Sequence, residues 1–497
     1  MFDGDLLAER ARITPEKLAL VSIETGQRLT YAQLNDRAER AAAVLIAAGI
    51  GTGDRYGLLA HNCVDYVPFF FAAGKTGAIV VPLSTRATAH ELGQIVADCG
   101  MSVLFHSDEF EQVVRELSVE DRRPRLSMRL ACPDGPGAPA RPDRRGRLSS
   151  TNGEAIHCLL YTSGTTGRPK GVMIPRRQLL WNGYNTAVNW GLREDDVSPV
   201  FTPMYHAGGL AAFLIPTFCV GGTIVLHKSF DPSVVWKTIE KERCTVVLGV
   251  PTIWKMLMEA PEFASAQLDS VRWFISGGAP LPAFIIDAYQ KRGVVFKQGY
   301  GMTEVGVNCF TMTVDDSYRK PGSIGRPMMF TEIELRDADG SEVKTNEVGE
   351  MFIRGPHVSL GYWKNPAATA DSYLDDGWFR TGDLARRDED GFFYIAGRRK
   401  EMFITGGVNV YPAEIEAELV QHPSVSDAAV IAVPDEKWGE VGVAFVVARE
   451  VSAEDLGSYL TTRISKYKVP RRFVFIDALP RTPYGKVEKG KLRDQLS

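Results

Sequence analysis

Short apolar runs alternate with longer helical stretches along the first hundred residues. An alanine-rich helix is predicted to begin near Thr30 and to end near Gly49, and another helix is predicted to begin near Ala89. Three apolar runs have the length and composition of buried strands, at residues 55–60, 78–83 and 102–105. This alternation of strands and helices predicts an α/β fold in which helices cover parallel sheets.

The segment from Val197 to Leu226 contains no Asp, Glu, Lys or Arg and is long enough to cross a bilayer. It is interrupted by Pro203, Pro216 and two Gly-Gly pairs, which favour a loop, a buried helix and then a strand that begins at Thr223. We therefore expect a segment of a soluble core and no transmembrane span.

The pattern changes at the short charged segment Gly397 to Glu401, which follows an apolar strand. Beyond it, a helix is predicted to begin at Pro412, and strand-like apolar runs follow. The chain has 497 residues, which is too long for one ordinary hydrophobic core. We predict a large N-terminal domain, residues 1–399, and a small C-terminal α+β domain, residues 400–497, joined by a charged hinge.

Composition and charge exclude several classes of protein. Apolar residues make up 44% and charged residues 24% of the chain, which is the balance of a folded soluble protein. The formal net charge of -4 gives no support for nucleic-acid binding. The seven cysteines are scattered without a CxxC pair, which argues against a zinc site or a disulfide framework and favours the cytoplasm. Two early acidic residues and no apolar run argue against a signal peptide.

The strongest candidate for chemistry is the segment from Tyr161 to Gly171, which is rich in Gly, Ser and Thr. Glycines let backbone N–H groups approach a polyphosphate, hydroxyl groups add donors, and Lys170 adds positive charge. A Walker A loop does not fit, because Pro169 stands where that motif needs Gly and Gly171 where it needs Ser or Thr. The segment therefore predicts a phosphate-binding loop of another type.

This loop resembles the phosphate loop of the adenylate-forming (AMP-binding) superfamily, which includes acyl- and aryl-CoA synthetases, carrier-protein adenylation domains and beetle luciferases. Further segments resemble the family's motifs, in the same order, along nearly the whole chain. They are residues 298–304 (QGYGMTE, core motif), 381–383 (TGD, ribose binding), 397–401 (GRRKE, hinge) and 480–486 (PRTPYGK, catalytic lysine). Within this superfamily, the sequence most resembles bacterial fatty-acyl-CoA and feruloyl-type CoA ligases. The resemblance implies parallel-sheet subdomains and a β-barrel-like subdomain in the large domain, and a small domain that rotates on the hinge.

The resemblance implies a site for ATP and Mg²⁺. The implied ATP contacts are Thr162, Ser163, Gly164, Thr165, Thr166, Gly167, Lys170, Gly278, Ala279, Pro280, Gln298, Gly299, Tyr300, Gly301, Met302, Thr303, Asp383, Arg398 and Lys486. Tyr300 is expected to stack on adenine, and Asp383 to accept hydrogen bonds from the ribose hydroxyls. Glu304 and Thr165 are the implied ligands of Mg²⁺, a hard cation that prefers oxygen.

Lys486 is the implied catalytic residue, together with Thr303 and Glu304. When a carboxylate attacks the α-phosphorus of ATP, both partners are anionic, and a lysine between them offsets their repulsion. In relatives the small domain then turns about the hinge, here Lys400, and brings another face to the acyl-AMP for reaction with coenzyme A. The glycines implied to line the coenzyme A tunnel on that face are Gly406 and Gly407.

The acyl group is implied to lie beside residues that resemble the family's acyl-binding segments, namely His206, Ala207, Gly208 and Gly277. Their small neighbours leave room for a sizeable apolar group. The segment 201–209 lacks the aspartate that amino-acid adenylation domains use, and the pocket segments show no Lys or Arg for a second carboxylate. A medium- or long-chain fatty acid and an aryl acid therefore both fit.

The sequence thus predicts an ATP-dependent acyl-CoA synthetase, which forms acyl-AMP and pyrophosphate and then transfers the acyl group to coenzyme A. Two alternatives stay open: an adenylating ligase that loads an acyl carrier protein, and an inactive sensor of nucleotide or acyl-CoA. The expected partners are small molecules and not nucleic acid, and a homodimer is compatible with the resemblance.

Overall fold

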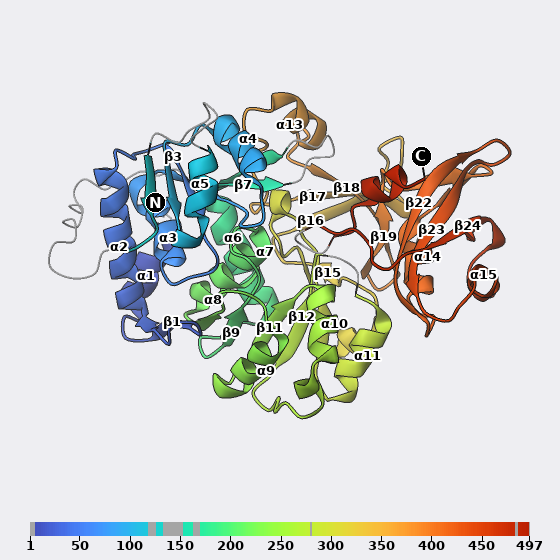
Figure 1. Cartoon of the computed structure of the whole chain (residues 1–497), viewed down its shortest axis with the longest axis horizontal. Coiled ribbons are helices and arrows are strands. Elements are labelled where there is room, and N and C mark those ends of the chain that lie inside the picture. Colours follow the sequence, from blue (N-terminus) through green and yellow to red (C-terminus); the bar gives the residue numbers. More distant parts are fainter. Residues whose placement is uncertain are drawn as a thin grey trace.

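Three largely parallel sheets form the body of the N-terminal part, and helices pack around them (Figure 1). The structure is a computed structural model that describes residues 5–117, 126–132, 153–162, 169–278, 281–482 and 486–496. The predicted α/β class is confirmed. No helix among these residues is long and apolar enough to cross a membrane.

The largest sheet has the strand order β6-β5-β3-β4-β7-β8 and is parallel except for the β7–β8 pair. Its strands are β3 (Arg55–Leu59), β4 (Ile79–Pro82), β5 (Val103–His106), β6 (Leu126–Arg129), β7 (Ile156–Thr162) and β8 (Lys170–Pro175). Leu58 and Leu59, adjacent in β3, belong to two different hydrophobic clusters. Both faces of this sheet are therefore covered, as is usual for parallel strands.

Two smaller sheets complete the body. The first has the order β2-β1-β10-β9 and contains β1 (Leu18–Ser22), β2 (Arg28–Thr30), β9 (Val197–Val200) and β10 (Thr223–Leu226). The second is parallel, in the order β11-β12-β13, and contains β11 (Val246–Gly249), β12 (Trp273–Ser276) and β13 (Phe296–Gln298). The segment 197–226 thus forms two strands of the core with buried helices between them. The buried helical part and the strand that begins at Thr223 were predicted, whereas β9, at the start of the segment, was not.

An antiparallel part links the body to the C-terminal domain. It contains the pair β14 (Phe310–Thr311) and β15 (Arg326–Pro327), and the sheet β16 (Glu332–Arg336), β17 (Val348–Arg354), β18 (Phe379–Arg387) and β19 (Phe393–Arg398). This sheet occupies the position of the β-barrel-like subdomain, and its last strand ends at the predicted hinge.

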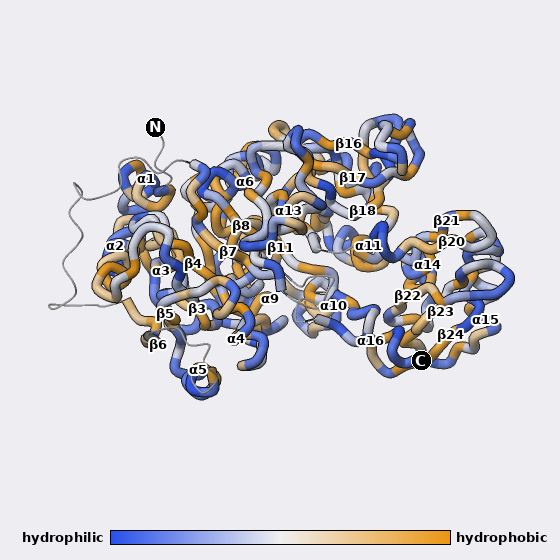
Figure 2. Tube along the Cα trace, turned by 90° about the horizontal axis from the view of Figure 1, so that it is seen from above, coloured by the Kyte–Doolittle hydropathy of each residue, from blue (hydrophilic) through white to orange (hydrophobic). Residues whose placement is uncertain are grey.

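The C-terminal domain is a sheet with helices packed on it, and its elements gather at one end of the molecule (Figures 1 and 2). The sheet contains β20 (Phe403–Thr405), β21 (Val408–Val410), β22 (Val425–Asp435), β23 (Gly439–Ala448) and β24 (Arg472–Phe475). Its helices are α14 (Pro412–Leu419), α15 (Ala453–Thr461) and α16 (Lys489–Asp494). Pro412 is the first residue of α14, as predicted, and Ile415 and Leu419 face the core.

The remaining helices precede the C-terminal domain, and most of them cover the N-terminal sheets, while α13 packs on β18. They are α1 (Leu6–Ile13), α2 (Tyr31–Ala47), α3 (Tyr66–Thr76), α4 (Ala89–Cys99), α5 (Glu111–Leu117), α6 (Arg176–Trp190), α7 (Ala207–Gly209), α8 (Ile215–Val220), α9 (Pro232–Lys241), α10 (Pro251–Glu259), α11 (Ala283–Lys291), α12 (Val314–Arg319) and α13 (Pro366–Ser372). Short turns of helix include η3 (Leu210–Leu214) and η5 (Thr303–Val305). A capping box fixes the start of α2: the Thr30 hydroxyl accepts from the Gln33 N–H, and the Gln33 side chain accepts from the Thr30 N–H.

Candidate active site

The β7–β8 hairpin holds the two ends of the predicted phosphate loop. Thr162, the last residue of β7, pairs with Lys170, the first residue of β8. The Lys170 ammonium group lies 5.0 Å from the centre of the Tyr362 ring. Ser163 to Gly167 lie outside the described residues, so only the two ends of the loop are placed. The two ends of the loop therefore lie side by side at one end of the β7–β8 hairpin.

The second part of the candidate site lies at the ends of the parallel strands β12 and β13, which end side by side. Ser276 pairs with Gln298, and the Gly299 N–H donates to the Ser276 carbonyl at 2.8 Å. The turn Gly277-Gly278 follows β12, with Gly278 in the left-handed region at φ 84°. Ala279 and Pro280 lie outside the described residues. Ligands of open α/β sheets bind beyond the carboxyl ends of the strands, which is where both turns lie.

The core motif continues from β13 as a tight turn. The Met302 N–H donates to the Gly306 carbonyl at 3.2 Å, and the Cys309 N–H donates to the Tyr300 carbonyl at 2.9 Å. A Cβ on Gly301 would lie 2.2 Å from the Val307 carbonyl carbon, so this close approach requires glycine. The turn presents Thr303 and Glu304 in η5.

Glu304 is a buried carboxylate, 6% exposed, whose Oε1 accepts a hydrogen bond from the Tyr362 hydroxyl at 3.0 Å. Burial raises its pKa, while the Tyr362 hydroxyl and the charges of Lys486 and Arg398 act in the opposite direction. The described residues contain no group of three acidic, His or Cys side chains arranged as a metal site. One carboxylate beside a phosphate loop nevertheless suits Mg²⁺, which usually binds one or two carboxylates together with substrate phosphates.

Asp383 is held by two neighbours. It pairs across β18 and β19 with Arg398, whose Nε lies 2.6 Å from Oδ1, and the Tyr300 hydroxyl donates to Oδ2 at 2.5 Å. Burial raises the pKa of Asp383, and Arg398 and Tyr300 lower it. The structure therefore brings together three residues that the motifs placed in separate segments. The Tyr300 ring is fixed edge-on against Phe310, and its stacking on adenine stays a prediction.

Lys486 reaches this region from the C-terminal domain. The Thr482 N–H donates to the Lys486 carbonyl at 2.8 Å, and the Lys486 N–H donates to the Thr482 hydroxyl at 3.2 Å. Much of the Lys486 side chain is exposed, but the protein around its ammonium group and the charge of Arg398 lower its pKa, against the opposing effect of Asp383 and Glu304. We call Glu304, Asp383, His206 and Lys486 the adenylation cluster, because the charge of Lys486 acts on all three others.

His206 lies at the start of α7, with its ring centre 4.6 Å from that of Tyr205. Burial, together with the positive charges of Lys486 and Arg86, lowers the pKa of His206 to about 3. The imidazole is therefore neutral near pH 7 and can accept or donate a hydrogen bond without carrying charge.

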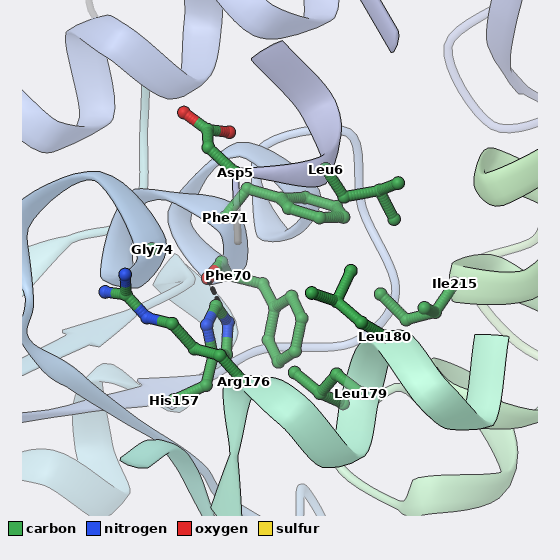
Figure 3. A pocket seen from close by; sticks show the side chains of 10 residues that line it. All are labelled: Asp5, Leu6, Phe70, Phe71, Gly74, His157, Arg176, Leu179, Leu180 and Ile215. Atoms are coloured by element: carbon green, nitrogen blue, oxygen red, sulfur yellow. Dashed lines mark hydrogen bonds between the residues drawn. The ribbon is translucent and has the colours of Figure 1, made fainter. Parts of the chain in front are cut away.

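Next to His206 lies an apolar cavity, which we call the inner cavity. It is lined by Phe70, Cys158, Leu160, Ile174, Gln178, Leu179, Asn182, Ala207, Leu210, Ala211, Thr303, Gly306 and Val307. Because Thr303 and Ala207 line it, this cavity adjoins the adenylation cluster. Phe70 and Leu179 line both this cavity and a second one next to it. In the second cavity they lie beside the side chains of Arg176 and His157 (Figure 3).

The predicted hinge is exposed, and hydrogen bonds and ion pairs hold the segments before and after it. The Arg399 N–H donates to the Gly382 carbonyl at 2.9 Å, and its guanidinium group pairs with Glu350. Beyond the hinge, Lys489 bridges Glu401 and Glu416 at 2.7 Å each. Gly406 and Gly407 lie in the exposed turn between β20 and β21, where the Gly406 N–H donates to the Trp438 carbonyl. Their role toward coenzyme A stays a prediction.

Sequence reasoning missed Tyr362, Gln178 and Asn182. Tyr362 links Lys170 to Glu304, and the Gln178 amide donates to the Thr303 carbonyl at 2.9 Å. Gln178 and Asn182 are one helical turn apart on α6, a spacing that places them on one face, but nothing local shows that this face meets the core motif.

Comparison with known proteins identifies the family of the chain. The AMP-binding enzyme model matches residues 7–363, and the AMP-binding enzyme C-terminal domain model matches residues 414–486. Feruloyl-CoA synthase of Amycolatopsis sp is 41% identical over 99% of this chain and 98% of that protein. Long-chain-fatty-acid--CoA ligase FadD13 of Mycobacterium tuberculosis is 37% identical over the same shares. O-succinylbenzoate coenzyme A synthetase of Bacillus subtilis, solved with ATP and magnesium ion, is 31% identical, with a TM-score of 0.87 over 99% of both chains.

The chain therefore belongs to the AMP-binding enzyme family, and the resemblance seen in the motifs is confirmed.

Proposed function

We propose that this acid–thiol ligase activates an apolar monocarboxylic acid with ATP, through Lys486, and passes the acyl group to coenzyme A. The chain is an ATP-dependent acyl- or aryl-CoA synthetase, as its family and relatives indicate. The observation that carries the proposal is the adenylation cluster, in which the charge of a lysine of the small domain acts on two carboxylates and a neutral imidazole of the large domain.

In the first step, a carboxylate oxygen of the acid bonds to the α-phosphorus of ATP, and the bond from that phosphorus to the bridging oxygen breaks, which releases pyrophosphate. Lys486 offsets the negative charge that collects between the two anions. We propose that Asp383, which is held by Arg398 and Tyr300, accepts hydrogen bonds from the ribose hydroxyls. Magnesium, held by Glu304 and the phosphates, would neutralise charge on the leaving group.

In the second step, the sulfur of coenzyme A bonds to the acyl carbon, the bond from that carbon to the phosphate oxygen breaks, and AMP leaves. The thiol loses its proton to the solvent or to a nearby base. We propose that the small domain turns about Lys400 between the steps, since a lysine that occupies the cleft during adenylation would lie in the way of the incoming thiol.

The choice of acid follows from the inner cavity. Its lining contains neither Lys nor Arg, so a second carboxylate would be buried without a partner there. The lining is mostly apolar, which favours an acid with an apolar chain or ring over one with a second charge. A relative named for a feruloyl group and another named for long-chain fatty acids support both alternatives. Location in the cytoplasm and a homodimer stay predictions, the second of which is tested by light scattering after gel filtration.

The test is pyrophosphate release by the purified protein with ATP and Mg²⁺, over a panel of fatty, aryl and dicarboxylic acids, with and without coenzyme A. Release that depends on one acid, with acyl-CoA detected by mass, supports the proposal. Acyl-AMP with untouched coenzyme A would instead indicate a carrier-protein acceptor. ATP binding without release for any acid would indicate a sensor.

A further inference from the structure

Tyr362 contacts two charged residues of the candidate active site. Its ring centre lies 5.0 Å from the Lys170 ammonium group, and its hydroxyl donates to Glu304 Oε1 at 3.0 Å. Tyr362 is 7% exposed and Glu304 is 6% exposed, so the hydrogen bond between them is largely shielded from water. One side chain therefore meets both the cation predicted to bind phosphate and the anion predicted to bind magnesium.

The backbone at Tyr362 is paired with the strand that carries Lys170. Tyr362 forms an antiparallel bridge with Val172, and the Trp363 N–H donates to the Gly171 carbonyl at 2.7 Å. Lys170 lies two residues before Val172 in β8, so both side chains project from the same face of the strand. Side chains that are diagonal to one another across paired strands are within reach when one of them is aromatic. The pairing with β8 therefore fixes the Tyr362 ring beside Lys170.

The Glu304 carboxylate is held through one of its two oxygens. Among the described residues, no side chain other than Tyr362 donates a hydrogen bond to it. A phenol keeps its proton near pH 7 and donates it to a single acceptor, which here is Oε1. Oε2 is left for another partner, and carboxylate oxygen is a ligand that Mg²⁺ prefers. Because the hydrogen-bond partners of a metal-binding carboxylate orient it, the Tyr362 hydroxyl can set the direction of Glu304.

Lys170 is close to Glu304 in the site but is not paired with it. Lys170 forms no ion pair with any residue that the structure describes, and its ammonium group lies over the Tyr362 ring instead. The attraction between an ammonium group and an aromatic face is weak, so a phosphate group readily replaces it. A direct ion pair between Lys170 and Glu304 would instead engage both charges before ATP arrives.

We propose that Tyr362 is a positioning residue for adenylation, whose hydroxyl orients Glu304 toward magnesium and whose ring keeps Lys170 from pairing with that carboxylate. The inference rests on the proposed function and adds to it a residue that prepares the binding of ATP with its metal. Tyr362 performs this role without touching the acid or the reacting atoms. The Tyr362 hydroxyl and ring therefore make separate contributions, which separate variants can remove.

The first test measures nucleotide binding with and without the metal, in the absence of any acid. The probe is α,β-methylene-ATP, in which carbon replaces the bridging oxygen, so that pyrophosphate cannot leave. In calorimetry, Tyr362→Phe should raise Kd for the magnesium complex of the probe by about 10-fold, and Kd measured in EDTA should stay within about threefold of wild type. The unchanged value in EDTA also shows that the variant is folded. An equal rise under both conditions, or no rise under either, would overturn the proposal.

Tyr373→Phe is the matched control. Tyr373 packs edge-on against Tyr362 with the ring centres 5.9 Å apart, and its hydroxyl bonds to Ser359 at 2.5 Å. The control therefore removes a hydroxyl from the same aromatic pair and leaves the bond to Glu304 in place. Kd for the magnesium complex should stay at the wild-type value. If Tyr373→Phe had the same effect as Tyr362→Phe, the cause would be the packing of the pair, and the proposal would be wrong.

The second test separates the ring from the hydroxyl. Tyr362→Leu removes both and leaves Lys170 free to pair with Glu304, so Kd for the probe in EDTA should exceed that of Tyr362→Phe by at least about threefold. With Lys170→Met added to both variants, this difference should disappear, because no cation is left to pair. A difference of the same size in that background would overturn the role of the ring.

Both tests are independent of the acid and of coenzyme A. If the proposed function were wrong, no acid would give pyrophosphate release, while the Kd values could still follow the expected pattern. If this inference were wrong, Tyr362→Phe would bind the magnesium complex of the probe as the wild type does, whichever acid the enzyme activates.

Discussion

At the residue scale, the motifs identified most of the chemistry and the structure supplied the contacts. Glu304, Asp383 and Lys486 are far apart in the sequence, and each alone would pass for an ordinary charge. Recognition of the family predicted them, and the structure brings them into one electrostatic cluster. The Tyr362 hydroxyl on Glu304 could not be predicted, because a hydrogen bond between distant segments leaves no local pattern.

Removal of the lysine charge should separate the two half-reactions. With Lys486→Ala, we expect acyl-AMP formation to slow by about 10²-fold or more, because the charge that stabilises the approach of two anions is lost. Acyl-CoA formation from supplied acyl-AMP should stay near the wild-type rate. Rapid-quench assays of each step measure both. Lys491→Ala, which removes an exposed lysine five residues further on, is the control and should change neither rate. An equal fall in the rates of both steps would contradict a rotation of the small domain between them.

Loss of one hydroxyl should weaken ATP binding. Tyr300→Phe removes the donor that fixes Asp383, and a hydrogen bond to a charged group is worth about 1.5–3 kcal/mol, so KM for ATP should rise by roughly 10-fold or more. Steady-state pyrophosphate release measures it. Tyr394→Phe removes the same kind of bond, from Tyr394 to Asp388 just after β18, and should leave KM for ATP unchanged. A similar effect of both variants would point to a general loss of stability.

At the element scale, local patterns predicted strands and helix starts well. The predicted strands 55–60, 78–83 and 102–105 were found as β3, β4 and β5, and α14 begins at Pro412 because proline is tolerated in the first turn. The order of strands in each sheet was not predictable, since β1 pairs with β10 across about two hundred residues. Such pairing depends on which apolar faces cover one another and not on the residues of either strand alone.

The predicted hinge can be tested through the freedom of its backbone, without changing a side-chain contact. Lys400→Pro fixes φ near −65° at the residue where the small domain is expected to turn. We expect acyl-AMP formation to stay within about threefold of wild type, and acyl-CoA formation from supplied acyl-AMP to fall by about 10²-fold. Lys400→Ala removes the side chain but keeps backbone freedom, so it serves as the control for loss of charge. Equal acyl-CoA rates in the two variants would exclude a hinge at this residue.

At the scale of the whole molecule, burial of histidine links the fold to pH. His157, in β7, packs on Phe70 and donates to its carbonyl, and His227, after β10, packs on Phe201. They are 4% and 2% exposed. Burial lowers the pKa of His157 to about 3 and that of His227 to about 4. The two lie beside different sheets of the N-terminal body, so their protonation acts on the packing of that body as a whole.

The direction of the effect follows from proton binding. Above the ordinary histidine pKa of about 6.5, both rings are neutral in the folded and unfolded chains and contribute no pH dependence. Below it, the unfolded chain binds protons that the folded chain does not, so the free energy of unfolding falls by up to about 1.4 kcal/mol per pH unit for each ring. From pH 6.5 to 4.5 the expected loss is therefore up to about 2–3 kcal/mol for each histidine.

His157→Gln keeps a donor for the Phe70 carbonyl and cannot titrate. The variant should therefore lose less unfolding free energy between pH 6.5 and 4.5 than the wild type, by the amount expected for one histidine. Urea unfolding of the N-terminal domain at pH 6.5 and 4.5 measures the difference between the variant and the wild type. His90→Gln changes an exposed histidine on α4 and should follow the wild type. If His157→Gln lost as much stability as the wild type over this range, the ring would already be charged in the folded chain. The largest sheet would then have to hold a cation against Phe70, which its apolar surroundings make costly.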